Sequence, residues 1–164
     1  MLSNKIKSIT KLSIVAALYV ALTYIFGFIS FGEIQFRIAE ILMLLCFFNR
    51  KYTISLVLGC FISNLFSPYG LPDVIFGTLA TFVACMGIML FNKKHLFLAS
   101  LMVPIGNIIV GIEISIINSF SLIPSLLTIF WVFIGEFVVV CIVGVPLIKL
   151  LMKNEKFEEL VLDI

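Results

Sequence analysis

The feature that most constrains this chain is the near absence of charge over long apolar stretches. Between Leu96 and Ile148 the charged residues are Glu113 and Glu136. The chain has 164 residues, of which 62% are hydrophobic and 12% charged, whereas soluble domains are roughly half apolar and a quarter charged. We therefore expect an all-α integral membrane protein that forms one domain over residues 1–164.

Six apolar segments are expected to form a compact bundle of transmembrane helices, at Lys11–Phe28, Phe36–Phe48, Tyr52–Phe66, Val74–Phe91, Leu96–Asn118 and Leu126–Leu151. A span needs about 20 residues, usually roughly 17–25. The second and third segments are shorter than this, so they are either short spans inside the bundle or a re-entrant pair. They are not one long span, because the charged pair Arg50 and Lys51 would then lie at the middle of the membrane.

The basic residues set the expected orientation. If the amino terminus is cytoplasmic and the six segments alternate in direction, ten of the 11 Lys and Arg residues fall on the inner side. The exception is Arg37. Because cytoplasmic loops of membrane proteins are enriched in Lys and Arg, this distribution predicts six crossings with both termini in the cytoplasm.

The stretch from Gly32 to Glu40 places ionic groups between two apolar segments. It contains Glu33 and Gln35, which we expect in a loop, and Arg37 and Glu40, which share a helix face at spacing i and i+3. Ionic groups this close to a bilayer core are costly unless they face protein or water, and they mark a functional site by default. The alternative is that Arg37 only pairs with Glu40 and orients it.

Acidic residues dominate the outer and intramembrane part of the predicted bundle. Arg37 is the base in this part, and the acids are Glu33, Glu40, Asp73, Glu113 and Glu136. A cavity with this balance favours a cationic or donor-rich small molecule. Asp73 has an alternative role, because Asp is a favoured residue for capping a helix amino terminus.

Further candidates lie near helix ends and on one helix face. Asn64 ends the third segment, and Trp131 lies about a turn before Glu136. Asn107 shares a helix face with Gly111, Ser115 and Asn118, while Glu113 points away from that face. Either this face lines the cavity and Glu113 meets a neighbouring helix, or the helix breaks near residues 104–106.

Ser13, Ala17 and Ala21 form a stripe of small residues at spacing i, i+4 and i+8 on the first segment. Small residues let membrane helices approach closely. The stripe therefore predicts either a contact within the bundle or a docking surface for a partner protein.

Several motifs are missing from the sequence. It has no phosphate-binding Gly-x-x-x-x-Gly-Lys-Ser/Thr loop, no HExxH or CxxC, and no basic tract with interleaved aromatics. We therefore expect no cofactor, no metal site and no nucleic-acid partner. No inverted repeat is visible, which disfavours a self-contained transporter of the common repeat type, so energy is expected to come from a partner. A small intramembrane enzyme with paired carboxylates and an ion-coupled carrier remain alternatives.

Three blocks of sequence resemble the QueT family. They are Gln35 to Glu40; Gly59 to Asn64 with the following Ser67-Pro68 and Asp73 to Gly77; and Gly135-Glu136 with Gly144 to Leu147. Members of this family are queuosine-precursor uptake proteins, the substrate-binding (S) components of energy-coupling factor (ECF) transporters. The resemblance covers nearly the whole chain, and the stripe of Ser13, Ala17 and Ala21 is similar to the motif by which S components dock.

The resemblance implies a six-helix bundle open to the outside of a bacterial cell membrane. The ligand would be a 7-deazaguanine such as 7-aminomethyl-7-deazaguanine, with another vitamin-like molecule as the alternative. The partners would be a transmembrane coupling protein and two ATPases, and the S component would tilt in the membrane during transport. We predict ligand contacts first from Glu40, Asn107 and Glu136, and then from Arg37, Asn64, Asp73, Glu113, Trp131 and Glu33.

Overall fold

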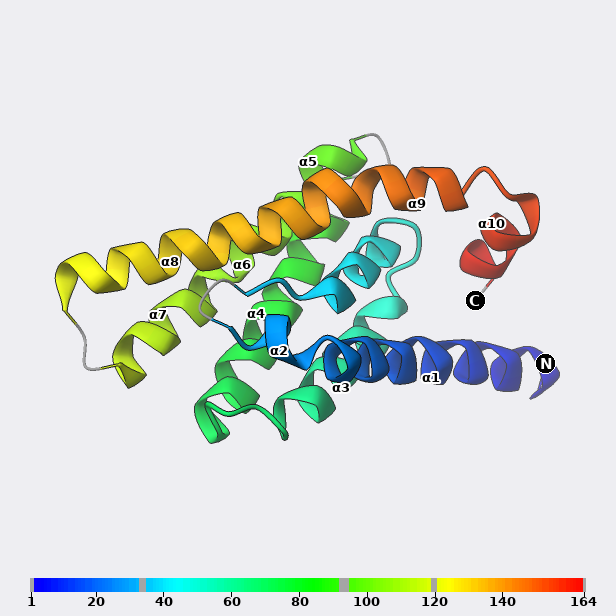
Figure 1. Ribbon diagram of the computed structural model, residues 1–164. Coiled ribbons are helices and arrows are strands. Elements are labelled where there is room, and N and C mark those ends of the chain that lie inside the picture. Colours follow the sequence, from blue (N-terminus) through cyan, green and yellow to red (C-terminus); the bar gives the residue numbers. More distant parts are fainter. Residues whose placement is uncertain (1, 33–34, 92–94, 119–120, 164) are drawn as a thin grey trace.

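The computed structural model describes residues 2–32, 35–91, 95–118 and 121–163, and within them the chain is helical without strands (Figure 1). The elements in chain order are α1 (Leu2–Ile25), α2 (Gly27–Ser30), η1 (Ile38–Phe47), α3 (Tyr52–Asn64), α4 (Leu71–Met89), α5 (Leu96–Ser100), α6 (Met102–Gly106), α7 (Ile108–Ile117), α8 (Leu122–Glu136), η2 (Phe137–Gly144), α9 (Val145–Leu151) and α10 (Glu155–Leu162). The all-α prediction is confirmed for the described residues.

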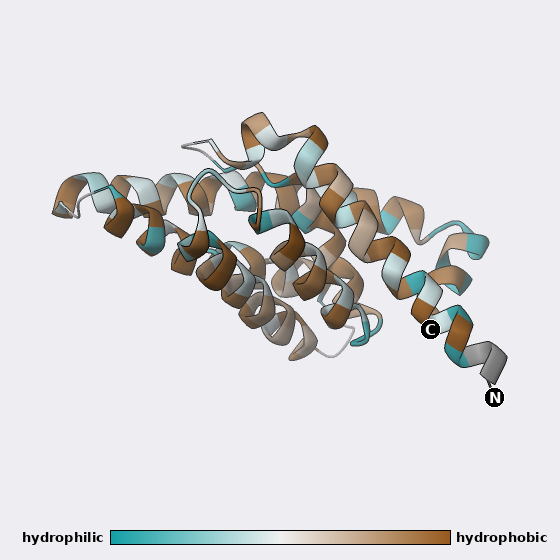
Figure 2. Cartoon of the chain, turned by 90° about the horizontal axis from the view of Figure 1, so that it is seen from below, coloured by the Kyte–Doolittle hydropathy of each residue, from teal (hydrophilic) through white to brown (hydrophobic). Residues whose placement is uncertain are grey.

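Four helical stretches are long and apolar enough to cross a membrane: Lys5–Ile25, Leu71–Met89, Leu96–Ile117 and Leu122–Leu151. The expected second and third segments are shorter apolar helices, η1 and α3. Apolar residues run along the helices, and hydrophilic residues gather near the carboxyl terminus and in the turns (Figure 2). The chain is therefore a multi-pass membrane protein, while the count of six crossings stays a prediction.

Helix η1 lies at the centre of the bundle. It packs against α1, α3, α4, α5, η2 and α9, and eight of its ten residues are buried. It is a 3₁₀-helix, which rises about 2.0 Å per residue against 1.5 Å in an α-helix. Ten residues therefore extend about 20 Å rather than about 15 Å, which lengthens a segment too short to span as an α-helix.

The last long stretch joins α8, η2 and α9 end to end, and it runs along one side of the molecule (Figure 1). Its middle, η2, is a π-helix that begins directly after Glu136. The stretch starts at Leu122 rather than at the predicted Leu126. Pro124 does not delay the start of this helix, because proline fits into the first turn, where a backbone N–H is not required.

The stretch from α5 to α7 is interrupted at Leu101 and Asn107. Of the two alternatives left open by the sequence, an interruption is present, but it lies at residues 101 and 107 rather than within 104–106. The face of Gly111 and Ser115 packs on α8, because a Cβ added at Gly111 would lie 2.9 Å from the Cα of Ile129. This face of α7 is therefore occupied by a neighbouring helix.

Helices α1 and α3 approach closely at Gly59. A Cβ there would lie 3.0 Å from the Cβ of Tyr19 and 3.1 Å from the carbonyl oxygen of Ala16.

At one end of the bundle, the Nζ of Lys11 donates to the carbonyl oxygens of Leu160 (3.3 Å) and Asp163 (2.6 Å). The amino- and carboxyl-terminal helices therefore lie at the same end (Figure 1).

Candidate functional site

A buried guanidinium organises the polar interior of the bundle. Arg37 is 2% exposed, and its Nη2 donates to both carboxylate oxygens of Asp73, at 3.2 and 3.3 Å. Its Nη1 lies 3.9 Å from the Oε1 of Glu40. The predicted pairing of Arg37 with Glu40 is thus present, but Asp73 holds the guanidinium more closely.

Asp73 does not cap the helix that contains it, so the alternative role given to it is wrong. Helix α4 begins at Leu71 after Gly70, whose φ of +71° favours glycine, and no side chain caps it. Asp73 is the third helical residue and is 0% exposed. Because a buried guanidinium is costly without a counter-charge, the side chain of Asp73 turns toward Arg37 instead of the backbone of α4.

Asn64 and Gly77 fix the position of Asp73. The Nδ2 of Asn64 donates to the carbonyl oxygen of Asp73 at 2.9 Å and approaches the Sγ of Cys60 at 3.4 Å. One turn along α4, a Cβ at Gly77 would lie 2.5 Å from that Nδ2 and 2.9 Å from the Oδ1 of Asp73. The absence of a side chain at Gly77 therefore makes room for both polar groups.

A second group of polar side chains joins three other elements. Asn107, at the interruption between α6 and α7, donates from Nδ2 to the Oε2 of Glu40 at 2.5 Å. Glu136, the last residue of α8, is 0% exposed, and its carboxyl faces that of Glu40 and the backbone of Arg37. The three residues predicted first as ligand contacts are therefore brought together.

Many buried polar atoms of this cluster have no hydrogen-bond partner within the described residues. They are Nε2 of Gln35, Nε of Arg37, Oε1 of Glu40, Oδ1 of Asn64, and both carboxylate oxygens of Glu113 and of Glu136. Buried polar groups in folded proteins are almost always paired, and an unpaired one needs an explanation. A bound ligand rich in hydrogen-bond donors would supply partners for most of these atoms.

The cluster is rich in acidic side chains. Arg37 faces four buried acids, since Glu113 on α7 lies near Asp73 and adds to Glu40 and Glu136. Asp73 already neutralises the guanidinium through two contacts. The remaining acids would attract a positively charged ligand, because a buried charge is stabilised by an opposite charge.

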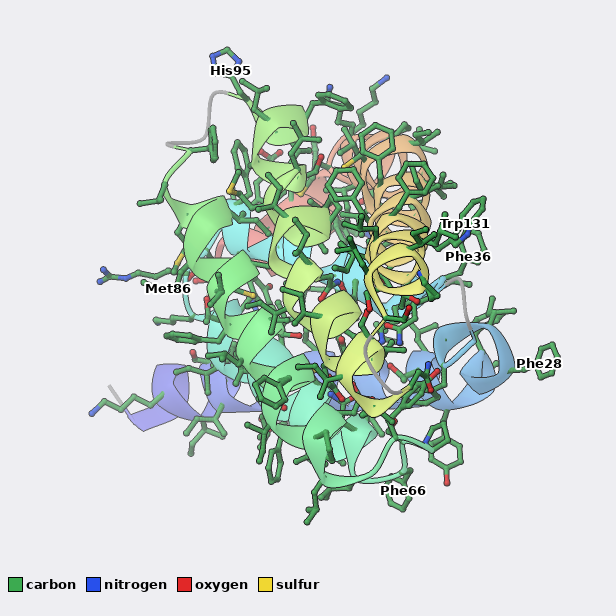
Figure 3. The ribbon with its side chains drawn as sticks, turned by 90° about the vertical axis from the view of Figure 1, so that its left-hand side faces the viewer. Phe28, Phe36, Phe66, Met86, His95 and Trp131 are labelled. Carbon is green, nitrogen blue, oxygen red and sulfur yellow. The ribbon has the colours of Figure 1, made fainter. Side chains whose placement is uncertain are left out.

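One predicted contact lies elsewhere, and another lies outside the described residues. Trp131 is 43% exposed and points outward, with its ring against that of Phe130 at 5.5 Å between centroids (Figure 3). Glu33 lies outside the described residues. The cluster that the structure assembles therefore consists of Arg37, Asn64, Asp73, Glu113 and the group around Glu136, without the indole ring.

Gln35, which the sequence predicts as a loop residue, is buried two residues before Arg37. It is 1% exposed. The signal that could have identified it is its position beside Arg37, in a short polar stretch between two apolar segments.

Ser13, Ala17 and Ala21 are all exposed on α1. The opposite face of α1 is the buried one, with Ala16, Tyr19 and Thr23 turned into the bundle. The small residues are therefore not part of the buried face of α1, and docking on a partner remains the prediction for them.

The model of the QueT transporter family matches residues 9–153, which is most of the chain. The chain belongs to the QueT transporter family. The resemblance inferred from the three sequence blocks is confirmed. Because QueT is a family of transporters, the alternative of an intramembrane enzyme is set aside.

A curated relative in the QueT family is named "Queuosine precursor transporter QueT" and comes from Lactococcus lactis subsp. cremoris (strain MG1363). It is 46% identical to this chain over 96 residues. The alignment covers 57% of this chain and 56% of the relative, so it spans little more than half the length of either protein. No solved structure matches the chain.

Proposed function

We propose that this chain is the substrate-binding subunit of an ECF-type importer in a bacterial cell membrane. It captures a queuosine precursor, a 7-deazaguanine such as 7-aminomethyl-7-deazaguanine, from outside the cell. The observation that carries the proposal is the buried acidic cluster around Arg37, whose oxygens lack partners. The name of the Lactococcus relative supports the class of ligand.

The chemistry of a deazaguanine complements the cluster. Its ring carries an amide N–H beside an exocyclic amine, and a carboxylate can accept hydrogen bonds from both. The free oxygens of Glu136 suit this edge, and those of Glu113, nearer Asp73, are further acceptors. The aminomethyl group adds a positive charge to the ligand. Because the cluster contains more carboxyl groups than guanidinium groups, it favours binding of such a cation.

The roles of the other polar residues follow from their contacts. Asn107 orients Glu40 by its hydrogen bond. Asn64 keeps a free Oδ1 and can accept from the ligand, while Asp73 holds Arg37 in place. Trp131 and Glu33 remain proposed contacts.

The exposed stripe on α1 supports a partner in transport. Ser13, Ala17 and Ala21 leave a shallow face on which a helix of a transmembrane coupling protein can pack closely. Two ATPase subunits bound to that coupling protein would provide the energy. This arrangement accounts for a binding site in a chain whose sequence lacks a nucleotide-binding loop.

Calorimetric titration of the purified, detergent-solubilised chain tests the proposal. The ligands are 7-aminomethyl-7-deazaguanine, its nitrile analogue, guanine and several vitamins. We expect tight binding of the aminomethyl compound and much weaker binding of guanine. A folded protein that binds a vitamin and no deazaguanine would overturn the ligand assignment and keep the transporter family.

A further inference from the structure

The segment that leads into η1 places two side chains on the inner side of the bundle. Burial alternates along it: Gln35 and Arg37 are 1% and 2% exposed, while Phe36 between them lies at the outer edge of the molecule (Figure 3). The backbone turns at Arg37, where φ is −84° and ψ is 86° and the N–H of Ile38 donates to the carbonyl oxygen of Phe36 at 3.1 Å. Gln35 and Arg37 are thus two buried polar side chains of one short segment, on either side of a residue at the edge of the molecule.

These two residues differ from the rest of the cluster in what they offer a ligand. The unpartnered atoms of Gln35 and Arg37 are nitrogens that donate hydrogen bonds, Nε2 and Nε. The unpartnered atoms of Glu40, Asn64, Glu113 and Glu136 are oxygens, which accept while the acids are ionised. The site therefore has a donor side, formed by one segment, and an acceptor side, formed by η1, α3, α7 and α8.

We propose that Gln35 is a specificity-determining residue, whose Nε2 donates a hydrogen bond to a ring carbonyl oxygen of the ligand. The inference rests on the proposed function, because a 7-deazaguanine carries such an oxygen beside its amide N–H. Arg37 is fixed by its two contacts with Asp73. Among the described residues, the Nε2 of Gln35 has no hydrogen-bond partner. It is therefore the donor of this segment that is available to a ligand.

The consequence is discrimination between oxo and amino heterocycles. An analogue with an amino group in place of the oxygen presents N–H groups to the Nε2 of Gln35, so the amide has to turn to present its Oε1 instead. The same change converts the ring N–H of the ligand into an acceptor, which the acceptor oxygens of the cluster cannot pair. Sites built to hydrogen-bond one group reject analogues that lack it much more strongly than apolar pockets reject an extra methylene.

The test compares two ligands that carry the same aminomethyl cation. One is 7-aminomethyl-7-deazaguanine, and the other is its counterpart with an amino group in place of the ring oxygen. Both are titrated into the wild type and into Gln35→Glu, which keeps the size of the side chain and removes the donor. Because both ligands bear the same charge, the effect of a new carboxylate on the cation cancels in the ratio of the two affinities.

We expect the wild type to prefer the oxo compound and Gln35→Glu to reduce that preference by about tenfold, the factor for about 1.4 kcal/mol. Gln35→Met, which has no donor, should also reduce the ratio. Asn118→Asp makes the same change from amide to acid at an exposed residue and should leave the ratio unchanged. Melting temperatures of all variants verify that they are folded.

The outcomes separate this inference from the function on which it rests. If Gln35→Glu weakens both ligands by the same factor, Gln35 has a structural role only and the inference is overturned. The same conclusion follows if the wild type binds both ligands equally. If the folded wild type binds no deazaguanine, the proposed function itself fails.

Discussion

The substitution Gly77→Ala tests whether the polar cluster depends on close packing. The added Cβ would lie 2.5 Å from the Nδ2 of Asn64 and 2.9 Å from the Oδ1 of Asp73, while ordinary contact begins near 3.4 Å. The amide nitrogen therefore has to move by about 0.9 Å and the carboxylate oxygen by about 0.5 Å, because interiors are too closely packed to absorb the overlap. The two displaced groups are those that hold Arg37 in place.

The cost follows from the contacts that are lost. A shift of this size breaks the 2.9 Å hydrogen bond from Asn64 to the carbonyl of Asp73, which is worth about 1 kcal/mol, and leaving its partners buried costs a further ~1–3 kcal/mol. Alanine stabilises a helix by roughly 0.5–1 kcal/mol relative to glycine. We therefore expect a net destabilisation of about 1–3 kcal/mol, and a melting temperature lower by several degrees, since 1 kcal/mol corresponds to about 2–4 °C at this size.

The chain provides a matched control in Gly27→Ala. No atom lies within 4 Å of a Cβ at Gly27, which is also helical. Alanine is the better helix former at both positions, with the larger gain inside α4 than at the first residue of the short α2. A lower melting temperature for Gly77→Ala than for Gly27→Ala in detergent therefore reports the steric term. Equal melting temperatures for the two variants would refute the packing argument. Ligand affinity provides a second measurement, because a displaced Asp73 releases Arg37 and should weaken binding by about tenfold, or ~1.4 kcal/mol.

Two further predictions concern the ligand and the partner. Glu136→Gln keeps the shape of the side chain and removes a charged acceptor, so calorimetry should record binding weaker by roughly 1.5–3 kcal/mol, whereas unchanged affinity in a folded variant removes Glu136 from the site. The double variant Ala17→Leu with Ala21→Leu should retain ligand binding and lose uptake when reconstituted with the coupling protein and ATPases. Uptake that survives this change would show that the stripe has no docking role.

The positions of the helices follow largely from the sequence. Runs of apolar residues without charge locate each long helix, since the bilayer tolerates few other structures. Errors arise at the boundaries. The helix expected from Val74 begins at Leu71 because Pro72 is accommodated in its first turn, where proline removes no hydrogen bond. The dense Pro and Gly residues before Asp73 predict the turn but not the residue at which it ends.

The partners within the polar cluster were harder to predict. Sequence spacing favours the pair of Arg37 and Glu40, which are three residues apart, but Asp73 forms the closer contact from 36 residues away. Local spacing carries no information on such a contact, which depends on how α4 packs beside η1. The outward position of Trp131 could not be predicted for a related reason: an aromatic residue in an apolar helix fits the lipid-facing side as well as the interior, and only the rotation of α8 decides between them.

Two unusual helices present the facing carboxylates. Glu40 lies in the 3₁₀-helix η1, and Glu136 directly precedes the π-helix η2, which packs on η1. Successive residues turn by about 120° in a 3₁₀-helix and by about 100° in an α-helix. Over the seven steps from Glu40 to Phe47 the difference reaches about 140°. If η1 were an α-helix, the side chains of Glu40 and Phe47 would point in directions that differ from the present ones by this angle. Glu40 and Phe47 therefore could not both be buried as they are now.

The geometry of η1 consequently links the site to the surface of the bundle. A ligand that engages Glu40 acts on a helix whose residues are nearly all buried, and a closely packed helix transmits a displacement to its neighbours. One of those neighbours is α1, which presents Tyr19 to the interior and Ala17 to the outside. Only two packed helices, η1 and α1, connect the polar cluster with the proposed docking face. We therefore expect ligand binding and docking on the partner to be coupled.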